Sequence, residues 1–329
     1  MTNNTQAQNA LQPDSGTMTS HLNGLRPSPS SLFRWCVVAA LAVFAATTPG
    51  FLSPTSIRSL LSTASLVGCV AVGMTFVTMS GNIMSFSLGA SLSATTVVFV
   101  WLLPYGAATA VTGALLFGAG INAAQGLVIG YFRANPIIVS MAAFALILGV
   151  FTMLTGGRGI YITTSDADIF NANFGVVPGP LVAFAACALV GQAILRFTRF
   201  GRRVFLVGSN PRAALAAGTE PWRTVTWAYA LAGLFTTVTA VLMASRYGSG
   251  DLQHGTGFEY QAISAVLVGG TAIQGGHGSV LRTFIGTMLI AIFKAVLILR
   301  GFSTELQQLL IGVVVLLVIM LQWRAGDLK

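Results

Sequence analysis

Long apolar runs with few charged residues recur along the whole chain. A helix that crosses about 30 Å of hydrocarbon needs about 20 predominantly apolar residues. The run 60–79 meets that length without a charge, and the runs 107–130 and 137–154 nearly do so. The further runs are 35–48, 88–103, 180–195, 225–244, 260–273, 280–299 and 306–323. This pattern predicts an all-α integral membrane protein with about ten transmembrane helices.

Composition supports the bilayer as the solvent of this chain. Of the 329 residues, 54% are hydrophobic and 8% are charged, whereas soluble domains carry about 25% charged residues. The net charge of +9 is also compatible with nucleic-acid binding, but the basic residues cluster beside the ends of the apolar runs. We therefore expect the chain to be embedded in a lipid bilayer and not to bind nucleic acid.

The basic residues also predict an orientation, because Lys and Arg are retained on the cytoplasmic side. If the amino terminus is inside, most basic residues fall inside, and only Arg58, Arg158, Arg246 and Arg300 fall outside. Both termini are then cytoplasmic. Polar residues 1–33 are expected to form a disordered cytoplasmic tail, 34–323 the transmembrane domain and 324–329 a second tail. A cleaved signal peptide is the alternative interpretation of the first run.

Several kinds of chemistry are missing from the sequence. A phosphate-binding P-loop needs a Lys followed by Ser or Thr, but Lys294 precedes Ala295 and Lys329 is the last residue. ATP hydrolysis by this chain is therefore not expected, and the chain is not predicted to be an enzyme. The three Cys residues lie in predicted spans and the three His residues are scattered, so neither a metal site nor a bound cofactor is expected.

The basic segment 198–224 contains the signals of a short helix. Asn210 is a good amino-terminal cap, Pro211 suits the first helical position, and Gly218 suits a left-handed exit. We expect a helix over 211–217 that is presented to the cytoplasm. It is either a docking element for a soluble partner or a surface linker.

Several short motifs together resemble one transporter family. The strongest is Gly-Gly-Thr-Ala-Ile-Gln-Gly-Gly-His-Gly-Ser at 269–279, followed by Gly286. Others are Gly-Phe-Glu at 257–259, Gly-Met-Thr-Phe-Val at 73–77 and Asn-Pro-Ile-Ile at 135–138. Most of residues 57–321 resembles the permeases of the ribose, galactose and xylose ABC importers. The resemblance implies the larger, ten-helix type of permease and a monosaccharide or related polyol as cargo.

The resemblance also implies the partners of the chain. They are a cytoplasmic ATP-binding subunit that holds ATP and Mg²⁺, a periplasmic solute-binding protein, and a second permease copy in a homodimer or heterodimer. A chain without a phosphate site needs an energy source in another subunit, which agrees with this implication. A secondary transporter or facilitator for a small polar solute is the alternative.

One segment departs from the family. After the second span the family usually reads Gly-Gly-Ile-Asp-Leu-Ser-Val-Gly, whereas residues 81–89 read Gly-Asn-Ile-Met-Ser-Phe-Ser-Leu-Gly. The acid is lost, Met84 stands in its place, and one residue is gained. This change bears on the substrate or on gating at that loop.

Short segments interrupted by glycine, one in each half of a transporter, indicate a site near the middle of the membrane. Here they are 81–89 and 269–278. We expect the substrate path to be lined by Asn82, Ser85, Phe86, Ser87, Thr271 and Gln274. The alternative is that the small residues only permit close helix packing.

Two further surfaces are predicted. The contact with the ATP-binding subunit is expected to involve Gly201, Arg202, Asn210, Pro211, Leu215, Gly218 and Trp222. A charged periplasmic rim for the binding protein is expected to consist of Arg158, Arg246, Asp251 and Glu259. Lys294, inside the run 280–299, either extends its ammonium group outward or pairs with Glu259 or Glu305.

Overall fold

The computed structural model describes residues 47–82, 84–163 and 178–326, with side chains described up to residue 320. These residues belong to one compact unit, Leu41–Lys329. The predicted tail 1–33 and nearly all of the first predicted span, 35–48, lie outside the described residues. Of the carboxyl-terminal tail predicted at 324–329, residues 324–326 continue the last helix and the rest lies outside the described part.

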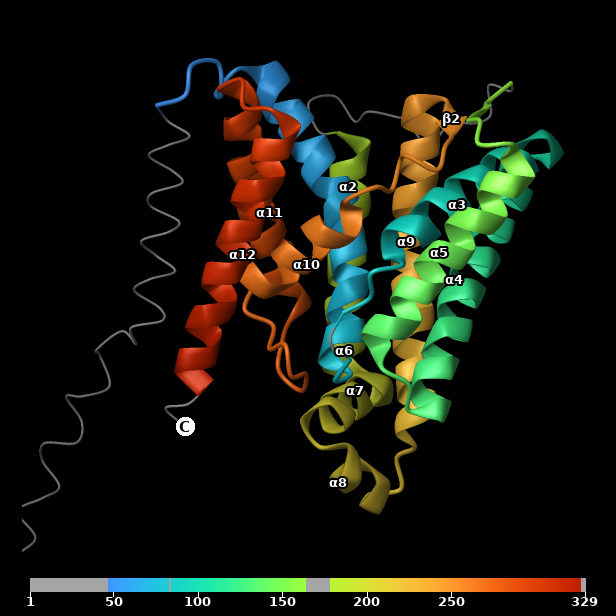
Figure 1. Ribbon diagram of the computed structural model, residues 1–329, viewed down its shortest axis with the longest axis vertical. Helices are drawn as coiled ribbons and strands as arrows, with labels where there is room; N and C mark the ends of the chain where they lie inside the picture. Colours follow the sequence, from blue (N-terminus) through green and yellow to red (C-terminus); the bar gives the residue numbers. More distant parts are fainter. Residues whose placement is uncertain (1–46, 83, 164–177, 327–329) are drawn as a thin grey trace, which may run out of the picture. The chain divides into compact units, whose positions relative to one another are not determined.

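Helices dominate the described part of the chain (Figure 1). The long, apolar helices that could cross a membrane are α2 (Pro54–Met79), α3 (Leu88–Leu102) extended by the 3-10 turn η2 (Leu103–Tyr105), α4 (Ala107–Phe132), α5 (Pro136–Thr155), α6 (Gly179–Phe197), α9 (Pro221–Tyr247) and α11 (Val280–Leu299). Within the described residues these are 7 candidate spans. The remaining elements are α7 (Arg199–Ser209), α8 (Pro211–Ala216), α10 (Phe258–Val268), α12 (Thr304–Gly326), β1 (Ile160–Tyr161) and β2 (Ser249–Gly250). A multi-pass helical protein is confirmed, and the count of ten spans stays a prediction.

Local signals explain where two of these helices begin and end. The Ser53 hydroxyl accepts a hydrogen bond from the Ser56 N–H at the start of α2, and Asn135 Oδ1 accepts one from Ile137 at the start of α5. A proline occupies the first turn of both helices, where its missing N–H is not needed. Gly156, with φ of 62°, ends α5 in the left-handed conformation that glycine adopts without strain.

α2 and α9 form the centre of the bundle. Figure 1 shows α11 and α12 on one side of them and α3, α4 and α5 on the other. Glycines bring the central helices close together: a Cβ atom on Gly73 would lie 2.9 Å from Ala232 Cα, and one on Gly233 would lie 2.8 Å from the Gly118 carbonyl carbon. Because lipid offers no hydrophobic drive between helices, such close contact of small residues is a main source of association.

The two ends of the bundle differ in chemistry. At one end, β1 pairs antiparallel with β2, with Ile160 opposite Gly250, and joins the end of α5 to the end of α9. At the other end lie α7 and α8 (Figure 1), where Arg199, Arg202 and Arg203 are exposed on α7. By the positive-inside rule we expect the end with α8 to face the cytoplasm.

Two predicted elements need correction. The run 260–273 is not one span, because α10 is 11 residues long. At 1.5 Å per residue that is about 16 Å, roughly half of the hydrocarbon thickness. The chain then leaves the helix at Gly269 and forms a loop up to Ser279. The segment 198–224 also contains a helix that was not predicted, α7, before the expected short one.

Candidate functional site: two interrupted segments and a capped helix

The first interrupted segment, 81–89, is fixed to α4 by a buried polar network that involves two of its serines. The Ser87 hydroxyl donates to Gln125 Oε1 at 2.5 Å, Gln125 Nε2 donates to Ser85 Oγ at 3.3 Å, and the two serine hydroxyls lie 3.1 Å apart. Ser85 and Ser87 are fully buried. Both were predicted to line the substrate path, yet their polar atoms hold the loop in place.

The two interrupted segments meet at a glycine contact near the end of α2. The Gly276 N–H donates to the Met79 carbonyl at 3.0 Å. A Cβ atom on Gly275 would lie 2.5 Å from Gly81 Cα. Thr271 is fully buried in the same loop, and its hydroxyl has no hydrogen-bond partner among the described residues. Close backbone contact therefore accounts for Gly275 and Gly276 of this motif.

Asn82 and Gln274 come together on one cavity of about 360 Å³. Asn82 Nδ2 donates to Ser80 Oγ at 2.9 Å, and Gln274 is exposed. Pro211, the first residue of α8, also lines this cavity. The structure thus brings two predicted path residues from distant segments to one cavity. This cavity lies beside α8, whereas the path residues were expected near the middle of the membrane.

The starts of α3 and α10 cross at a second glycine contact. The Gly255 N–H donates to Ser93 Oγ at 2.8 Å, and the carboxylate of Glu259 lies against Gly89, where a Cβ atom would overlap with Oε2. Glu259 is only 4% exposed, and its Oε2 makes no hydrogen bond within the described residues. Glu259 was predicted on an exposed rim, but it is buried, with its carboxylate between the starts of α3 and α10.

Two aromatic rings mark the outward face of this crossing. Phe86, from the first segment, and Tyr260, from α10, lie with ring centroids 6.3 Å apart in an edge-to-face arrangement. Tyr260 is 61% exposed, so it presents an apolar ring with a hydroxyl group on this face. Sequence reasoning included Phe86 and missed Tyr260. The sequence signal that could have identified Tyr260 is its position directly after Glu259, at the beginning of the apolar run 260–273.

The other three predicted rim residues gather at the β1–β2 end. Arg158 and Arg246 are exposed, and Asp251 is half-buried. Asp251 Oδ1 accepts a hydrogen bond from the Gln253 N–H at 2.8 Å, and Oδ2 lies beside Gly159. Charges of both signs therefore face outward at the end opposite α8.

The predicted cap of the short helix is confirmed. Asn210 Oδ1 accepts from the N–H groups of Arg212 at 3.0 Å and Ala213 at 3.1 Å. Pro211 is the first residue of α8, and Gly218 has φ of 73° directly after the helix. Leu215 is 49% exposed. α8 is thus a short helix held at both ends with an apolar side chain facing outward.

Three residues predicted to contact the ATP-binding subunit lie outside α8 and its caps, and their surroundings differ from one another. Gly201 is buried against the end of α6, where a Cβ atom would lie 2.6 Å from the Ile194 carbonyl oxygen. Trp222 packs on α4, with its ring 6.1 Å from that of Tyr131. Of the predicted residues outside α8 and its caps, only Arg202 is exposed. Gly201 is therefore buried in the bundle, whereas Trp222 packs on α4 and is partly exposed, so its contact with the ATP-binding subunit stays a prediction.

No cluster of three or more His, Cys, Asp or Glu side chains suited to a metal ion occurs among residues whose positions are described.

The chain is similar in sequence to known transport permeases. The family model described as "Branched-chain amino acid transport system / permease component" matches residues 56–319. The ribose import permease protein RbsC of Escherichia coli is 29% identical over 86% of this chain and 90% of its own length. RbsC of Bacillus subtilis is 30% identical over 83% and 86% of the two chains. The autoinducer 2 import system permease protein LsrD of Escherichia coli is 31% identical over 86% and 88%. No solved structure gives a significant match.

Proposed function

Because the chain belongs to the family of branched-chain amino acid transport system / permease components and is a permease subunit of an ABC importer, we propose that it carries a monosaccharide or related polyol across a bacterial inner membrane. The resemblance read from the sequence is confirmed at the level of the family. The matched relatives are permeases, so ATP hydrolysis belongs to a separate subunit. The names of the relatives, ribose and autoinducer 2 import proteins, support a sugar-like cargo.

The observation that carries the proposal is the shared cavity of Asn82 and Gln274. Each side chain comes from one of the two interrupted segments, and Pro211 of α8 lines the same cavity. A motion of α8 would therefore reach both segments directly. Amide groups donate and accept hydrogen bonds, which suits a hydroxyl-rich cargo that must be released at this end.

The aromatic pair supports the same class of cargo. The ring of Tyr260 is exposed and lies beside Phe86 at the crossing of the half-helices. An aromatic ring offers an apolar face and, in tyrosine, a polar tip. We propose that the cargo passes along this face, between the outer rim and the amide-lined cavity.

Partner surfaces follow from the two ends. We propose that α8 docks onto the ATP-binding subunit and that Arg158, Arg246 and Asp251 dock the solute-binding protein. α5 leaves most of its apolar residues exposed, among them Met141, Leu146 and Met153. We propose that a second permease copy, identical or related, completes the passage between two such subunits.

The test is reconstituted uptake. The permease, its ATP-binding subunit and its binding protein are placed in proteoliposomes with radiolabelled ribose, xylose or galactose. We expect uptake that needs both ATP and the binding protein. The Asn82→Ala, Gln274→Ala double variant should reduce uptake roughly threefold to tenfold, which is the worth of one or two hydrogen bonds. Thr112→Ala is the control, because this exposed α4 hydroxyl bonds only its own helix backbone. Uptake that continues without ATP would establish a facilitator instead.

Orientation has its own test. Single cysteines replace Arg202 on α7 and Arg158 before β1, both exposed, in a background without other cysteines. A membrane-impermeant thiol reagent added outside the cell should label position 158 and leave position 202 unlabelled until the membrane is opened. Labelling of position 202 from outside contradicts a cytoplasmic α8.

A further inference from the structure

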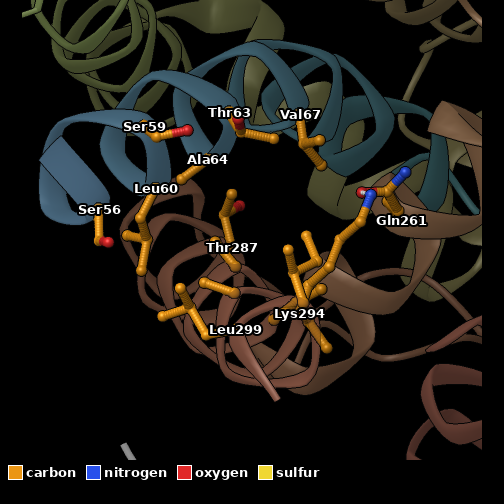
Figure 2. A pocket seen from close by; sticks show the side chains of 14 residues that line it. Ser56, Ser59, Leu60, Thr63, Ala64, Val67, Gln261, Thr287, Lys294 and Leu299 are labelled. Carbon is orange, nitrogen blue, oxygen red and sulfur yellow. Dashed lines mark hydrogen bonds between the residues drawn. The ribbon is translucent and has the colours of Figure 1, made fainter. Parts of the chain in front are cut away.

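A cavity of about 150 Å³, with an apolar wall and a few polar side chains, lies between α2 and α11, apart from the two interrupted segments. Figure 2 shows Ser59 and Thr63 of α2 on one side, Thr287 of α11 on the other, and Lys294 beside Gln261 of α10 at one end. The cavity extends along residues 56–67 near the start of α2 and residues 287–299 up to the end of α11. It therefore lies in the half of the bundle that we expect to face the periplasm.

Lys294 is the only charged side chain among the described residues that line this cavity. Its Nζ donates to Gln261 Oε1 at 3.1 Å, and neither Glu259 nor Glu305 forms an ion pair with it within the described part of the chain. An ionisable side chain inside a membrane span is costly and is a mark of function. The ammonium group has three N–H donors, so its bond to one neutral amide oxygen leaves two donors without a bond to any described residue.

The wall of α2 carries hydroxyl groups at helical spacing. Ser56, Ser59 and Thr63 follow one another at intervals of three and four residues, which places them on one face of the helix. In contrast with the hydroxyl of Thr287, which donates to Thr283 at 2.9 Å, the side chains of Ser59 and Thr63 form no hydrogen bond with any described residue. Their hydroxyls are free to bind a ligand.

The size of the cavity limits that ligand. An apolar protein cavity of about 150 Å³ accommodates one benzene molecule, and Ser59 and Thr63 on the wall of this cavity are exposed, so a six-membered ring fits inside while its substituents extend through the open side. Leu60 and Ile290 contribute an apolar wall, which suits the less polar face of such a ring.

We propose that this cavity binds a monosaccharide-sized acid, such as a uronic acid. Its carboxylate pairs with Lys294, and its hydroxyls bind Ser59, Thr63 and the amide of Gln261. A charge-assisted hydrogen bond to carboxylate is about twice as strong as a neutral one, so Lys294 makes the site selective for the acid over the neutral sugar. Gln261 lies two residues after Glu259 on α10, and a bound acid therefore contacts the half-helix that forms the crossing. The site needs no ATP-binding subunit and does not depend on the identity of the transported sugar.

Equilibrium binding tests the selectivity. The purified permease in lipid nanodiscs is titrated with glucuronate and with glucose, which match in ring size and differ in charge. We expect glucuronate to bind and Lys294→Met to weaken that binding roughly tenfold to hundredfold, whereas Lys294→Arg retains it. Equal affinity for the two sugars, or unchanged glucuronate binding in Lys294→Met, would overturn the proposal.

Cysteine labelling tests the same site with Lys294 in place. Thr63→Cys is introduced after replacement of Cys36, Cys69 and Cys187 by Ala, and is treated with an anionic and a cationic methanethiosulfonate reagent. We expect the anionic reagent to react faster and glucuronate to slow it, and we expect this preference to disappear in Lys294→Met. Failure of both reagents to reach position 63, or a preference for the cationic one, contradicts an accessible anion site.

Discussion

The backbone N–H of Gly276 donates a hydrogen bond to the carbonyl oxygen of Met79, at 3.0 Å. Met79 ends α2, so its carbonyl group has no partner further along that helix. The loop after α10 satisfies it from the other half of the chain. This bond joins the second interrupted segment to the end of α2, directly before the first segment, and any motion of the second segment must either break it or carry the end of α2 along.

Gly276→Ala should weaken this junction. Gly276 has φ of 72°, and a Cβ atom would lie 2.7 Å from Ser209 Cα, so alanine brings both backbone strain and a clash. We expect a loss of about 1–3 kcal/mol in stability, seen as a lower midpoint of thermal unfolding in detergent. Gly149→Ala is the control, because nothing lies within 4 Å of its Cβ position in α5 and alanine favours helix. Equal unfolding midpoints for Gly276→Ala and wild type would show that the contact at Gly276 does not stabilise the protein.

Removal of the amide of Gln125 should release the first segment. In Gln125→Ala the hydroxyls of Ser85 and Ser87 lose their α4 partner and keep only the bond to each other at 3.1 Å, and a buried polar group left without a partner costs about 1–3 kcal/mol. We expect lower thermal stability together with faster proteolysis of the segment 81–89. Ser87→Ala in the same background should then cost less than it does alone, because the partner is already gone. Fully additive losses would show that the network does not act as a unit.

Binding-protein docking at the β1–β2 end should depend on salt. Exposed charges mainly steer association, and the screening length falls from about 20 Å at roughly 20 mM salt to about 6 Å at roughly 300 mM. Stimulation of ATPase activity by the binding protein should therefore weaken over this range. Arg158→Glu with Arg246→Glu should reverse or abolish that dependence, whereas Arg58→Glu, at the start of α2, serves as the control. Stimulation that is the same at both salt concentrations removes these charges from the docking surface.

The sequence predicted those features of the structure that depend only on neighbouring residues. Hydropathy identified α2, α4 and α5 because a long apolar run is sufficient evidence for a span. The ends of α8 followed from Asn210, Pro211 and Gly218, whose effects reach only a few residues. These features needed no knowledge of the rest of the fold.

The features that were missed depend on distant partners. The apolar character of the chain continues past Val268 through Ala272 and Ile273, so composition alone extended α10 into the loop. Glu259 was assigned to the surface because its burial depends on Gly89, far away in the sequence. The amphipathic pattern of α7, with Val204 and Val207 buried opposite the arginines, was the one local signal that allowed a better prediction.

The last prediction concerns α8 as the contact with the ATP-binding subunit. Leu215 is exposed on a helix that is capped at both ends, and a rigid apolar contact transmits motion better than a flexible one. Leu215→Asp places a charge on that contact without touching a membrane span. An apolar anchor at an interface centre is worth at least about 2 kcal/mol, so we expect the ATP-binding subunit to bind roughly thirtyfold more weakly, measured by co-purification and by coupled uptake.

Two comparisons separate a contact from a folding defect. Leu206→Asp alters an exposed leucine on the neighbouring helix α7 and should leave the bound subunit in place. Trp222→Asp should instead lower the amount of folded permease, because its ring packs on Tyr131 of α4. Permease abundance that is normal in Leu215→Asp and low in Trp222→Asp therefore assigns α8 to the partner and Trp222 to the bundle. If Leu215→Asp keeps both the bound subunit and full uptake, α8 is only a linker, and the loop from Gly275 to Arg282 becomes the next place to look for the coupling contact.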